Sequence, residues 1–336
     1  MKLERIIVLL FVALFACSNT APISSGIWLT SSVTFQDSSV VIEKVSYLST
    51  GLKVYGQVCY PANPGSYPIL VFAHGGFEGL TTEWNSGACK TLGAKYVMLQ
   101  PSYRGEDGSE GKIEVCNGEV DDTIEMLKIG QKLPFANRSS VGLIGGSHGG
   151  CIVTRAVQRG VAARVVVDMY GPTDWSNENT FLTQKISTIT EPSFLKAYQG
   201  LLDLLQNAIG GTPTQVPSAY ASRSAISSTG TLSSFAGSVL IIHGVNDALV
   251  PYQQSCNLAL QTGGFSSHHV TNLFFALTTN LPTGCEALNF STLDPRVTWA
   301  GKRYFMIYDA YGHGDGDSLM QIAVLKDALD FLAAKL

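Results

Sequence analysis

Short apolar runs recur along the chain and alternate with segments of helical spacing. Runs rich in β-branched residues occupy positions 40–47, 53–60, 69–73, 96–100, 141–144, 165–169, 239–242 and 304–308. From position 69 onward most of these runs are almost entirely apolar instead of alternating. Continuous apolar runs are typical of strands that are buried on both faces of a parallel sheet.

Strands that alternate with helices form βαβ units, so the pattern predicts an α/β fold with a mostly parallel central sheet and helices on both faces. The first two strands have no helix between them, and we expect them to pair antiparallel. The last helix is the clearest, with apolar residues at steps of three and four. We expect its buried face to consist of Leu319, Ile322, Leu325, Leu329 and Leu332.

Two segments have no predicted place in the sheet. Residues 176–237 are expected to form a lid-like insertion of helices over one end of the sheet. Residues 264–301 are expected to be loop-like and to carry Cys285, with His268 and His269 as a solvated pair. The predicted catalytic domain therefore spans residues 40–336 and contains both insertions.

The beginning of the chain resembles an export signal. Lys2 and Arg5 precede an apolar run at positions 6–16, which is too short to span a bilayer. We therefore expect residues 1–16 to be a signal peptide. The residues that end at Cys17 resemble the lipobox of bacterial lipoproteins, which implies a lipid on the Cys17 sulfur and a periplasmic or cell-envelope protein. The alternative is an ordinary signal cleaved near Ala16 or Ala21 and a secreted protein.

In either case the Ser-rich residues 17–39 are expected to form a flexible tether, and any membrane association would occur only through the N-terminal lipid.

The composition supports export. Charged residues make up 14% of the chain, against about 25% in an average globular protein. The formal net charge of −4 provides no cationic surface for phosphates and makes nucleic-acid binding unexpected.

Six cysteines follow Cys17, and an even number in an exported chain favours disulfides. The pairs Cys256 with Cys285 and Cys89 with Cys116 lie in loop-rich neighbouring segments and are plausible. Cys151 lies in an apolar run, which is consistent with a buried thiol. No CxxC spacing occurs, so no zinc site is expected.

The candidate chemistry lies at strand ends. Gly145-Gly146-Ser147-His148-Gly149 fits the G-x-S-x-G pattern of a nucleophile elbow, although glycine is common enough here for a chance match. Its context favours the elbow, because an apolar strand precedes it and a helical segment follows. Ser147 is therefore the candidate nucleophile, and the alternative is a glycine turn that happens to contain a serine.

A serine hydroxyl needs a base, and the base needs an acid to orient it. Asp247 follows the run at 239–242 and His313 follows the run at 304–308, in the chain order that this architecture uses. Asp174 is the rival acid. The other histidines have simpler explanations: His74 and His243 brace loops, His148 follows the nucleophile, and His268 and His269 lie in the loop-like segment.

The developing oxyanion needs two backbone amides. A glycine-rich loop, His74-Gly75-Gly76-Phe77-Glu78-Gly79, follows the run at 69–73. We expect the amide of Gly76, with Phe77 as its rival, to act together with the amide of His148.

These pieces resemble the α/β-hydrolases, and among them the catalytic domain of the prolyl oligopeptidase (S9) peptidases. The matching pieces stand in the family's order over residues 53–336. They are His74-Gly75-Gly76, Ser102-Tyr103-Arg104-Gly105, Asp121-Asp122, Gly145-Gly146-Ser147-His148-Gly149-Gly150, Gly171-Pro172-Thr173-Asp174-Trp175, His243-Gly244-Val245-Asn246-Asp247 with Val250-Pro251, and Gly312-His313-Gly314. The resemblance implies Ser147, Asp247 and His313 as the triad and implies no cofactor or metal.

Two features depart from the family. The residues before Lys53 are too few for the β-propeller of its larger members, and residues 264–301 lengthen the stretch between acid and histidine. Several of the motifs also occur in dienelactone-hydrolase-like and acetyl-ester hydrolases. We therefore expect an exported serine peptidase that acts on a small peptide substrate. The alternatives are a carboxylesterase that acts on a small ester and a non-catalytic lipoprotein with an idle hydrolase fold.

Overall fold

The computed structural model describes residues 26–80, 83–271, 277–278, 280, 282–316 and 318–336. The expected signal peptide and Cys17 lie outside these residues, as does the first part of the expected tether. In the described part, no helix has both the length and the apolar character needed to cross a membrane.

One eleven-stranded sheet runs through the molecule in the order β1-β2-β3-β5-β4-β6-β7-β8-β11-β9-β10. The strands from β5 to β9 in this order are parallel, whereas β1, β2, β3 and β10 pair antiparallel with their neighbours. Their bounds are β1 Thr30–Gln36, β2 Val40–Ser49, β3 Leu52–Pro61, β4 Tyr67–Ala73, β5 Val97–Pro101, β6 Ala136–Gly146, β7 Val165–Met169, β8 Ser238–Gly244, β9 Ser266–Val270, β10 Leu277–Thr278 and β11 Arg303–Tyr308. The mostly parallel sheet and the antiparallel start are confirmed.

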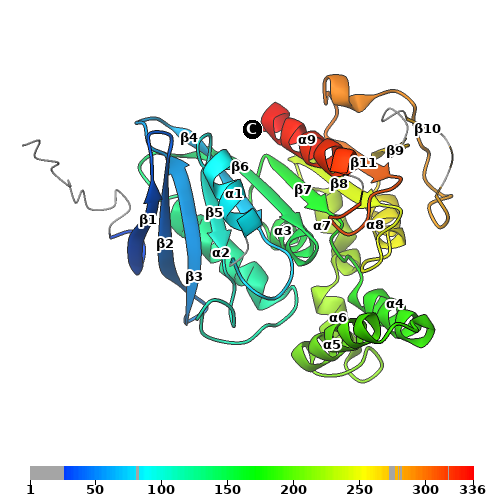
Figure 1. Cartoon of the computed structure of the whole chain (residues 1–336). Coiled ribbons are helices and arrows are strands. Elements are labelled where there is room, and N and C mark those ends of the chain that lie inside the picture. The colour runs from blue at the N-terminus through cyan, green and yellow to red at the C-terminus, as the bar shows by residue number, and fades with distance from the viewer. Residues whose placement is uncertain (1–25, 81–82, 272–276, 279, 281, 317) are drawn as a thin grey trace, which may run out of the picture.

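Helices cover both faces of the sheet and create two cores (Figure 1). On one face lie α1 (Glu83–Leu92) and α9 (Ser318–Lys335); on the other lie α2 (Gly118–Gly130), α3 (His148–Gln158) and α8 (Gln253–Thr262). The strands alternate between the cores: in β7, Val166 faces one and Val165 and Val167 face the other. This double burial explains why the central strands read as continuous apolar runs.

The segment between β7 and β8 forms a helical cap at one end of the sheet, as expected (Figure 1). The cap consists of α4 (Trp175–Thr188), α5 (Pro192–Ile209) and α6 (Pro217–Arg223). The 3₁₀ helix η1 (Ala225–Ser228) and α7 (Thr229–Ser233) complete the segment and pack against α3 and α8 on one face of the sheet. A second 3₁₀ helix, η2 (Pro295–Val297), precedes β11.

Two segments differ from expectation. Residues 30–36, which fall in the expected tether, form β1 and pair with β2. Residues 264–301 were expected to be a loop, but they supply β9 and β10 at the other edge of the sheet. Neither β1 nor β9 has an apolar run, so their sequences carry no strand signal; pairing with a neighbouring strand determines their conformation.

The prediction of a solvated pair at His268 and His269 is wrong, because both side chains are buried on β9. Burial is tolerated because both rings have polar partners. Nδ1 of His268 lies 3.1 Å from the carbonyl oxygen of Ser291, and Nε2 of His269 lies 2.7 Å from Oδ1 of Asp309.

The expected buried face of α9 is also wrong in its first half. Leu319 is 66% exposed and Ile322 is 63% exposed. Met320 and Val324 are buried in their place, together with the acidic residue Asp327. Apolar residues occur on more than one side of this helix, so helical spacing alone cannot select the buried side. Asp327 accepts a hydrogen bond from the hydroxyl of buried Tyr308 at 2.6 Å, which gives that hydroxyl its partner.

Three disulfides join Cys59 to Cys89, Cys116 to Cys151 and Cys256 to Cys285. The expected pair Cys256–Cys285 is confirmed. The expected pair Cys89–Cys116 is wrong, because these two residues lie in different cores on opposite faces of the sheet. Cys151 is buried as expected, but it is a disulfide partner and not a free thiol.

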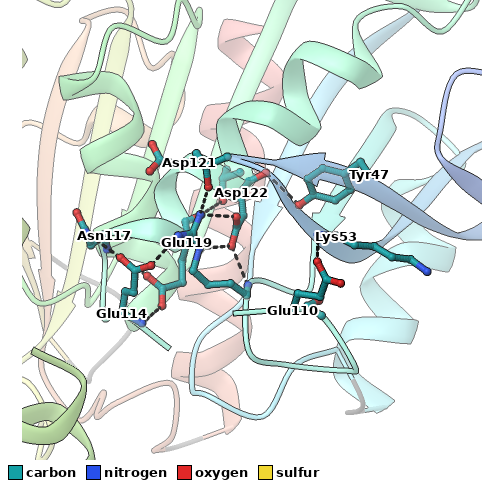
Figure 2. A network of polar contacts seen from close by, with 12 residues as sticks. Tyr47, Lys53, Glu110, Glu114, Asn117, Glu119, Asp121 and Asp122 are labelled. Atoms are coloured by element: carbon teal, nitrogen blue, oxygen red, sulfur yellow. Dashed lines mark hydrogen bonds and ion pairs between the residues drawn. The ribbon is translucent and has the colours of Figure 1, made fainter. Parts of the chain in front are cut away.

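A buried ion pair holds the long loop at 102–117 that connects β5 to α2. Arg104 donates through Nη2 to Oδ1 of Asp122 at 2.9 Å and through Nε to Oδ2 at 3.1 Å. Glu119 accepts the backbone amides of Glu114 and Val115 at 2.6 and 3.1 Å. Figure 2 shows Glu114, Glu119 and Asp122 close together in this network of polar contacts. The loop thus has a defined shape without regular secondary structure.

We expect Asp122→Ala to lower the free energy of unfolding by about 3 kcal/mol, because it removes the acceptor of Nε, Nη2 and the backbone amide of buried Arg104 and leaves Glu114 as the remaining carboxylate beside this charge. Glu125→Ala is the matched control, since Glu125 pairs with Lys128 at the surface; its loss is expected to cost less than about 1 kcal/mol. Denaturant unfolding of both variants measures the difference. Equal, small losses would contradict a stabilising role for the Arg104–Asp122 pair.

Candidate functional site

Ser147 lies in a tight turn between β6 and α3, with φ of 56° and ψ of −127°. This backbone conformation is rare for a residue with a side chain and is typical of functional turns. The flanking glycines are needed because the chain passes close to itself. A Cβ on Gly149 would lie 2.0 Å from the carbonyl oxygen of Ala73, and one on Gly145 would lie 2.2 Å from that of Gly149.

The structure brings Ser147, His313 and Asp247 together from the ends of β6, β11 and β8. Nε2 of His313 lies 2.7 Å from Oγ of Ser147, and Nδ1 lies 2.8 Å from Oδ2 of Asp247. A carboxylate only accepts, so the proton of the neutral ring is on Nδ1 and Nε2 is free to accept the serine proton. This is the relay of hydrogen bonds that activates a serine hydroxyl.

Asp247 is 8% exposed, and its carboxylate is surrounded by donors. Oδ1 accepts the backbone amides of Leu249 at 2.9 Å and Val250 at 2.8 Å. Burial raises the pKa of Asp247, but hydrogen bonds from His243 and His313 outweigh burial and hold the pKa well below the ordinary value. The group is therefore a carboxylate throughout the neutral range.

The rival acid, Asp174, has a different position. Its Oδ1 accepts the amides of Ser176 at 3.0 Å and Asn177 at 3.1 Å, which makes it the N-cap of α4. It makes no described contact with His313.

His243 contacts the site in a way that the sequence reasoning missed. Its Nε2 lies 3.1 Å from the carbonyl oxygen of Val250, as expected for a loop brace, and also 3.2 Å from Oδ2 of Asp247. Both neighbours are acceptors, so Nε2 carries the proton, and Nδ1 accepts from Oγ of Ser255 at 2.7 Å. In the sequence, the signal that could have indicated this contact is the spacing of four residues between His243 and Asp247.

The side chain of His148 fixes the glycine-rich loop. The backbone amide of Cys116 donates to its Nε2 at 2.9 Å, so its Nδ1 carries the proton and donates to the carbonyl oxygen of Gly76 at 3.3 Å. Burial, followed by the charge of His74, lowers the pKa of His148 to about 3. The ring therefore remains neutral and orients the peptide bond between Gly76 and Phe77.

The candidate oxyanion donors lie around Ser147. Among the described residues, none accepts a hydrogen bond from the backbone amides of Gly76, Phe77 or His148. All three residues line the same cavity as Ser147. It stays a prediction that the amides of His148 and Gly76 bind the oxyanion, with the amide of Phe77 as the alternative to that of Gly76.

A second loop supports the glycine-rich loop from behind. Oε2 of Glu106 lies 3.3 Å from Nε2 of buried His74, which stacks on Tyr103 with ring centroids 4.2 Å apart. Oδ2 of Asp107 accepts the amide of Leu80 at 2.7 Å. His74 therefore braces the glycine-rich loop as expected. The loop at 102–117 supplies the residues that contact it from the other side.

A cavity of about 140 Å³ opens beside Ser147 and His313. Its walls come largely from the cap and from the residues after β8. They include Trp175, Glu178, Leu201, Leu205, Leu249 and Val250.

A wider hollow of about 760 Å³ lies between β9 and η2, and Ser147, His313 and Asp247 are not among the residues that line it. Within the described residues, no three His, Cys, Asp or Glu side chains converge on a position that could hold a metal ion.

Comparison with known sequences identifies relatives of this chain. The model of the prolyl oligopeptidase family matches residues 85–264, a range that includes Ser147 and Asp247 but not His313. The uncharacterized peptidase YtmA of Bacillus subtilis (strain 168) is 27% identical over 212 residues, which cover 63% of this chain and 75% of that protein.

Solved structures with the same fold include an esterase and a peptidase. Acetyl xylan esterase 1 from Thermoanaerobacterium sp. JW/SL YS485 is 14% identical with a TM-score of 0.58, over 90% of this chain and 87% of that one. The acylaminoacyl peptidase of Pyrococcus horikoshii is 16% identical with a TM-score of 0.62, over 89% of this chain and 42% of that one. At these identities the likeness shows the α/β-hydrolase fold alone.

The neutral ring of His148 makes a pH-dependent contribution to stability. Between pH 6.5 and about pH 3 the unfolded chain binds a proton at this residue and the folded chain does not, so stability is lost as the pH falls through this window. We expect the contribution to fall by about 1.4 kcal/mol per pH unit. His148→Gln, which keeps a donor and an acceptor but binds no proton, should lack this dependence. Unfolding of both proteins across the window measures it, and parallel slopes would contradict a neutral buried ring.

Proposed function

Because the chain belongs to the prolyl oligopeptidase family and is a serine hydrolase, we propose that it is an exported peptidase with Ser147, His313 and Asp247 as its catalytic triad. The observation that carries the proposal is the relay from Oγ of Ser147 to Nε2 of His313, at 2.7 Å, and from Nδ1 of His313 to Asp247, at 2.8 Å. The relay supports covalent catalysis by the serine.

In the first half-reaction, Oγ of Ser147 attacks the carbonyl carbon of the scissile bond and its proton passes to Nε2 of His313. Asp247 accepts the Nδ1 hydrogen bond and stabilises the imidazolium that forms. The oxyanion lies against the amides of His148 and Gly76. His313 then gives its proton to the leaving amine, the carbon–nitrogen bond breaks, and an acyl ester on Ser147 remains.

In the second half-reaction, a water molecule attacks the acyl ester while His313 takes one of its protons. Collapse of the tetrahedral intermediate breaks the bond to Oγ, and His313 returns the proton to Ser147. The product is a carboxylic acid, and the enzyme regains its starting state. These steps use side chains and backbone amides of this chain together with water.

A carboxylesterase is the second candidate, because an ester passes through the same steps with an alcohol as leaving group. The likeness to acetyl xylan esterase 1 spans 87% of that esterase, whereas the acylaminoacyl peptidase is spanned over only 42% of its length. The similarity thus extends over most of that esterase and over less than half of that peptidase.

Export is part of the proposal. The six cysteines after Cys17 are all paired in disulfides, which form and persist in oxidising compartments. Together with the signal-like residues 1–16, this supports a periplasmic, cell-envelope or secreted protein. A lipid on Cys17 would provide a membrane anchor.

We expect Ser147→Ala to lower kcat by roughly 10⁴- to 10⁶-fold, because it removes the attacking atom. Steady-state hydrolysis measures the loss, and circular dichroism checks that the fold is unchanged. A fluorophosphonate should label the wild-type protein and not the variant. A variant that keeps near-normal turnover, or a wild-type protein that is not labelled, would overturn the proposed role of Ser147.

The leaving group is tested by comparing a p-nitrophenyl ester and a p-nitroanilide that carry the same acyl group. Amide turnover within about a hundredfold of ester turnover supports the peptidase, since amides need protonation of the leaving group. Ester turnover without measurable anilide cleavage makes the protein an esterase.

His243 is expected to position Asp247. His243→Asn should lower kcat roughly ten- to a hundredfold with little change in KM, because the carboxylate loses a donor and its fixed orientation. The acidic limb of the kcat/KM profile should move to higher pH, because the Asp247 carboxylate, without the hydrogen bond from His243, stabilises the imidazolium beside it more strongly. Ser255→Ala, which leaves the contact with Asp247 in place, is the matched control. An unchanged pH profile in His243→Asn would limit His243 to bracing the loop.

A further inference from the structure

A carboxyl group lies in the wall of the cavity beside Ser147. Glu178 on α4 is 3% exposed and is the only acidic residue among the described residues that line this cavity. Its neighbours there include the apolar side chains of Trp175, Leu201 and Leu205. Acidic side chains are rarely buried unless they are paired, so its position needs a physical explanation.

Glu178 is held in place by an amide of known orientation. Oε1 of Gln254 accepts the backbone amides of Thr173 and Asp174, each at 2.8 Å, so the NH₂ group of Gln254 must face the opposite way. That group donates to Oε2 of Glu178 at 2.8 Å. Gln254 is itself 2% exposed. The carboxyl is therefore part of a rigid arrangement at the junction of the cap and the sheet.

The other carboxyl oxygen is available to a ligand. The one side-chain hydrogen bond of Glu178 among the described residues is that of Oε2 with Gln254, so Oε1 has no partner there, while the residue lines the cavity. Burial, followed by the negative charge of Asp247, raises the pKa of Glu178 well above the ordinary value of a glutamate. A positively charged group beside it would favour the ionised form and form a charge-assisted hydrogen bond in a poorly solvated place.

The size and lining of the cavity limit what fits. Its volume is about 140 Å³, similar to apolar cavities of about 150 Å³ that accommodate benzene. The occupant thus has a small apolar body and, to satisfy Glu178, a hydrogen-bond donor. An aminoacyl group with a small apolar side chain and a free amino group meets both requirements.

We propose that Glu178 binds the free amino group of the acyl part of the substrate, so that the enzyme releases single apolar residues from the N-terminus of peptides or from aminoacyl esters. This inference rests on the proposed function, because Ser147 must attack the carbonyl group of that residue. Glu178 is then the specificity-determining residue, and the cap that carries it selects substrates by their amino group.

The test compares three anilides with the same leaving group: leucyl, 4-methylpentanoyl and N-acetyl-leucyl p-nitroanilide. The second lacks only the amino group, and the third blocks it. We expect wild-type kcat/KM to be at least about tenfold higher for the leucyl substrate than for either other, since hydrogen bonds to charged groups are worth at least that much. Equal values, or a preference for an acyl group without the amine, would overturn the inference. This comparison needs no variant.

Glu178→Gln isolates the carboxyl. The new amide can accept from Gln254 through its oxygen, and its NH₂ group then faces the cavity as a donor where Glu178 had an acceptor. We expect kcat/KM for the leucyl substrate to fall at least about tenfold and that for 4-methylpentanoyl p-nitroanilide to change less than about threefold. Asp203→Asn is the matched control, because Asp203 is exposed on α5 and its substitution should change neither value. A Glu178→Gln enzyme that keeps the preference for the amine would overturn the inference.

Failure of the proposed peptidase activity is distinguishable from failure of this inference. If no anilide is cleaved, the methyl esters of leucine and of 4-methylpentanoic acid replace the anilides. A tenfold preference for the leucine ester that Glu178→Gln abolishes would still support the role of Glu178. No preference among esters that Ser147 does hydrolyse would overturn it while leaving the triad intact.

Discussion

The strained turn at Ser147 is the constraint on which the rest of the site depends. A positive φ at this residue sends Oγ of Ser147 out toward His313 and the next side chain, His148, into the protein. The ring of His148 then connects the glycine-rich loop to the loop at 102–117 through Gly76 and Cys116. One backbone conformation thus directs the hydroxyl of Ser147 toward His313 and also positions the loops that surround it.

Two buried carboxyl groups near this turn follow opposite electrostatic rules. Asp247 receives several hydrogen bonds, which hold its pKa well below the ordinary value and keep it charged next to His313. Glu178 has a single described donor and lies among apolar side chains, so its pKa is raised well above the ordinary value. The first arrangement suits a permanent anion in a relay, and the second suits a group that ionises only beside a cation. Asp247 follows a strand of the sheet, β8, whereas Glu178 lies on α4 of the cap.

The errors in the predicted fold have a common physical origin. Strand β9 is polar in sequence and becomes a strand because β11 offers a free edge for pairing. The spacing of α9 does not select its buried side, which includes Asp327 because the hydroxyl of Tyr308 on β11 donates to it. Cys89 pairs with Cys59 because both lie in the core on the same face of the sheet. Cys116 is slightly nearer to Cys89 along the chain, but it lies in the core on the other face. In each case the deciding partner is distant along the chain.

The sequence by itself determined the central strands and the positions of Ser147, Asp247 and His313 at their ends, because local patterns record burial and turn chemistry. Continuous apolar runs indicate a parallel sheet, and the carboxyl ends of parallel strands meet at one edge. Only the tertiary structure decided what surrounds these residues. Asp174 is a helix cap and not the partner of His313, His243 touches Asp247, and Gln254 directs Glu178 into the cavity. These contacts join segments with no local signal in common, since hydrogen-bond geometry is set by packing and not by spacing along the chain.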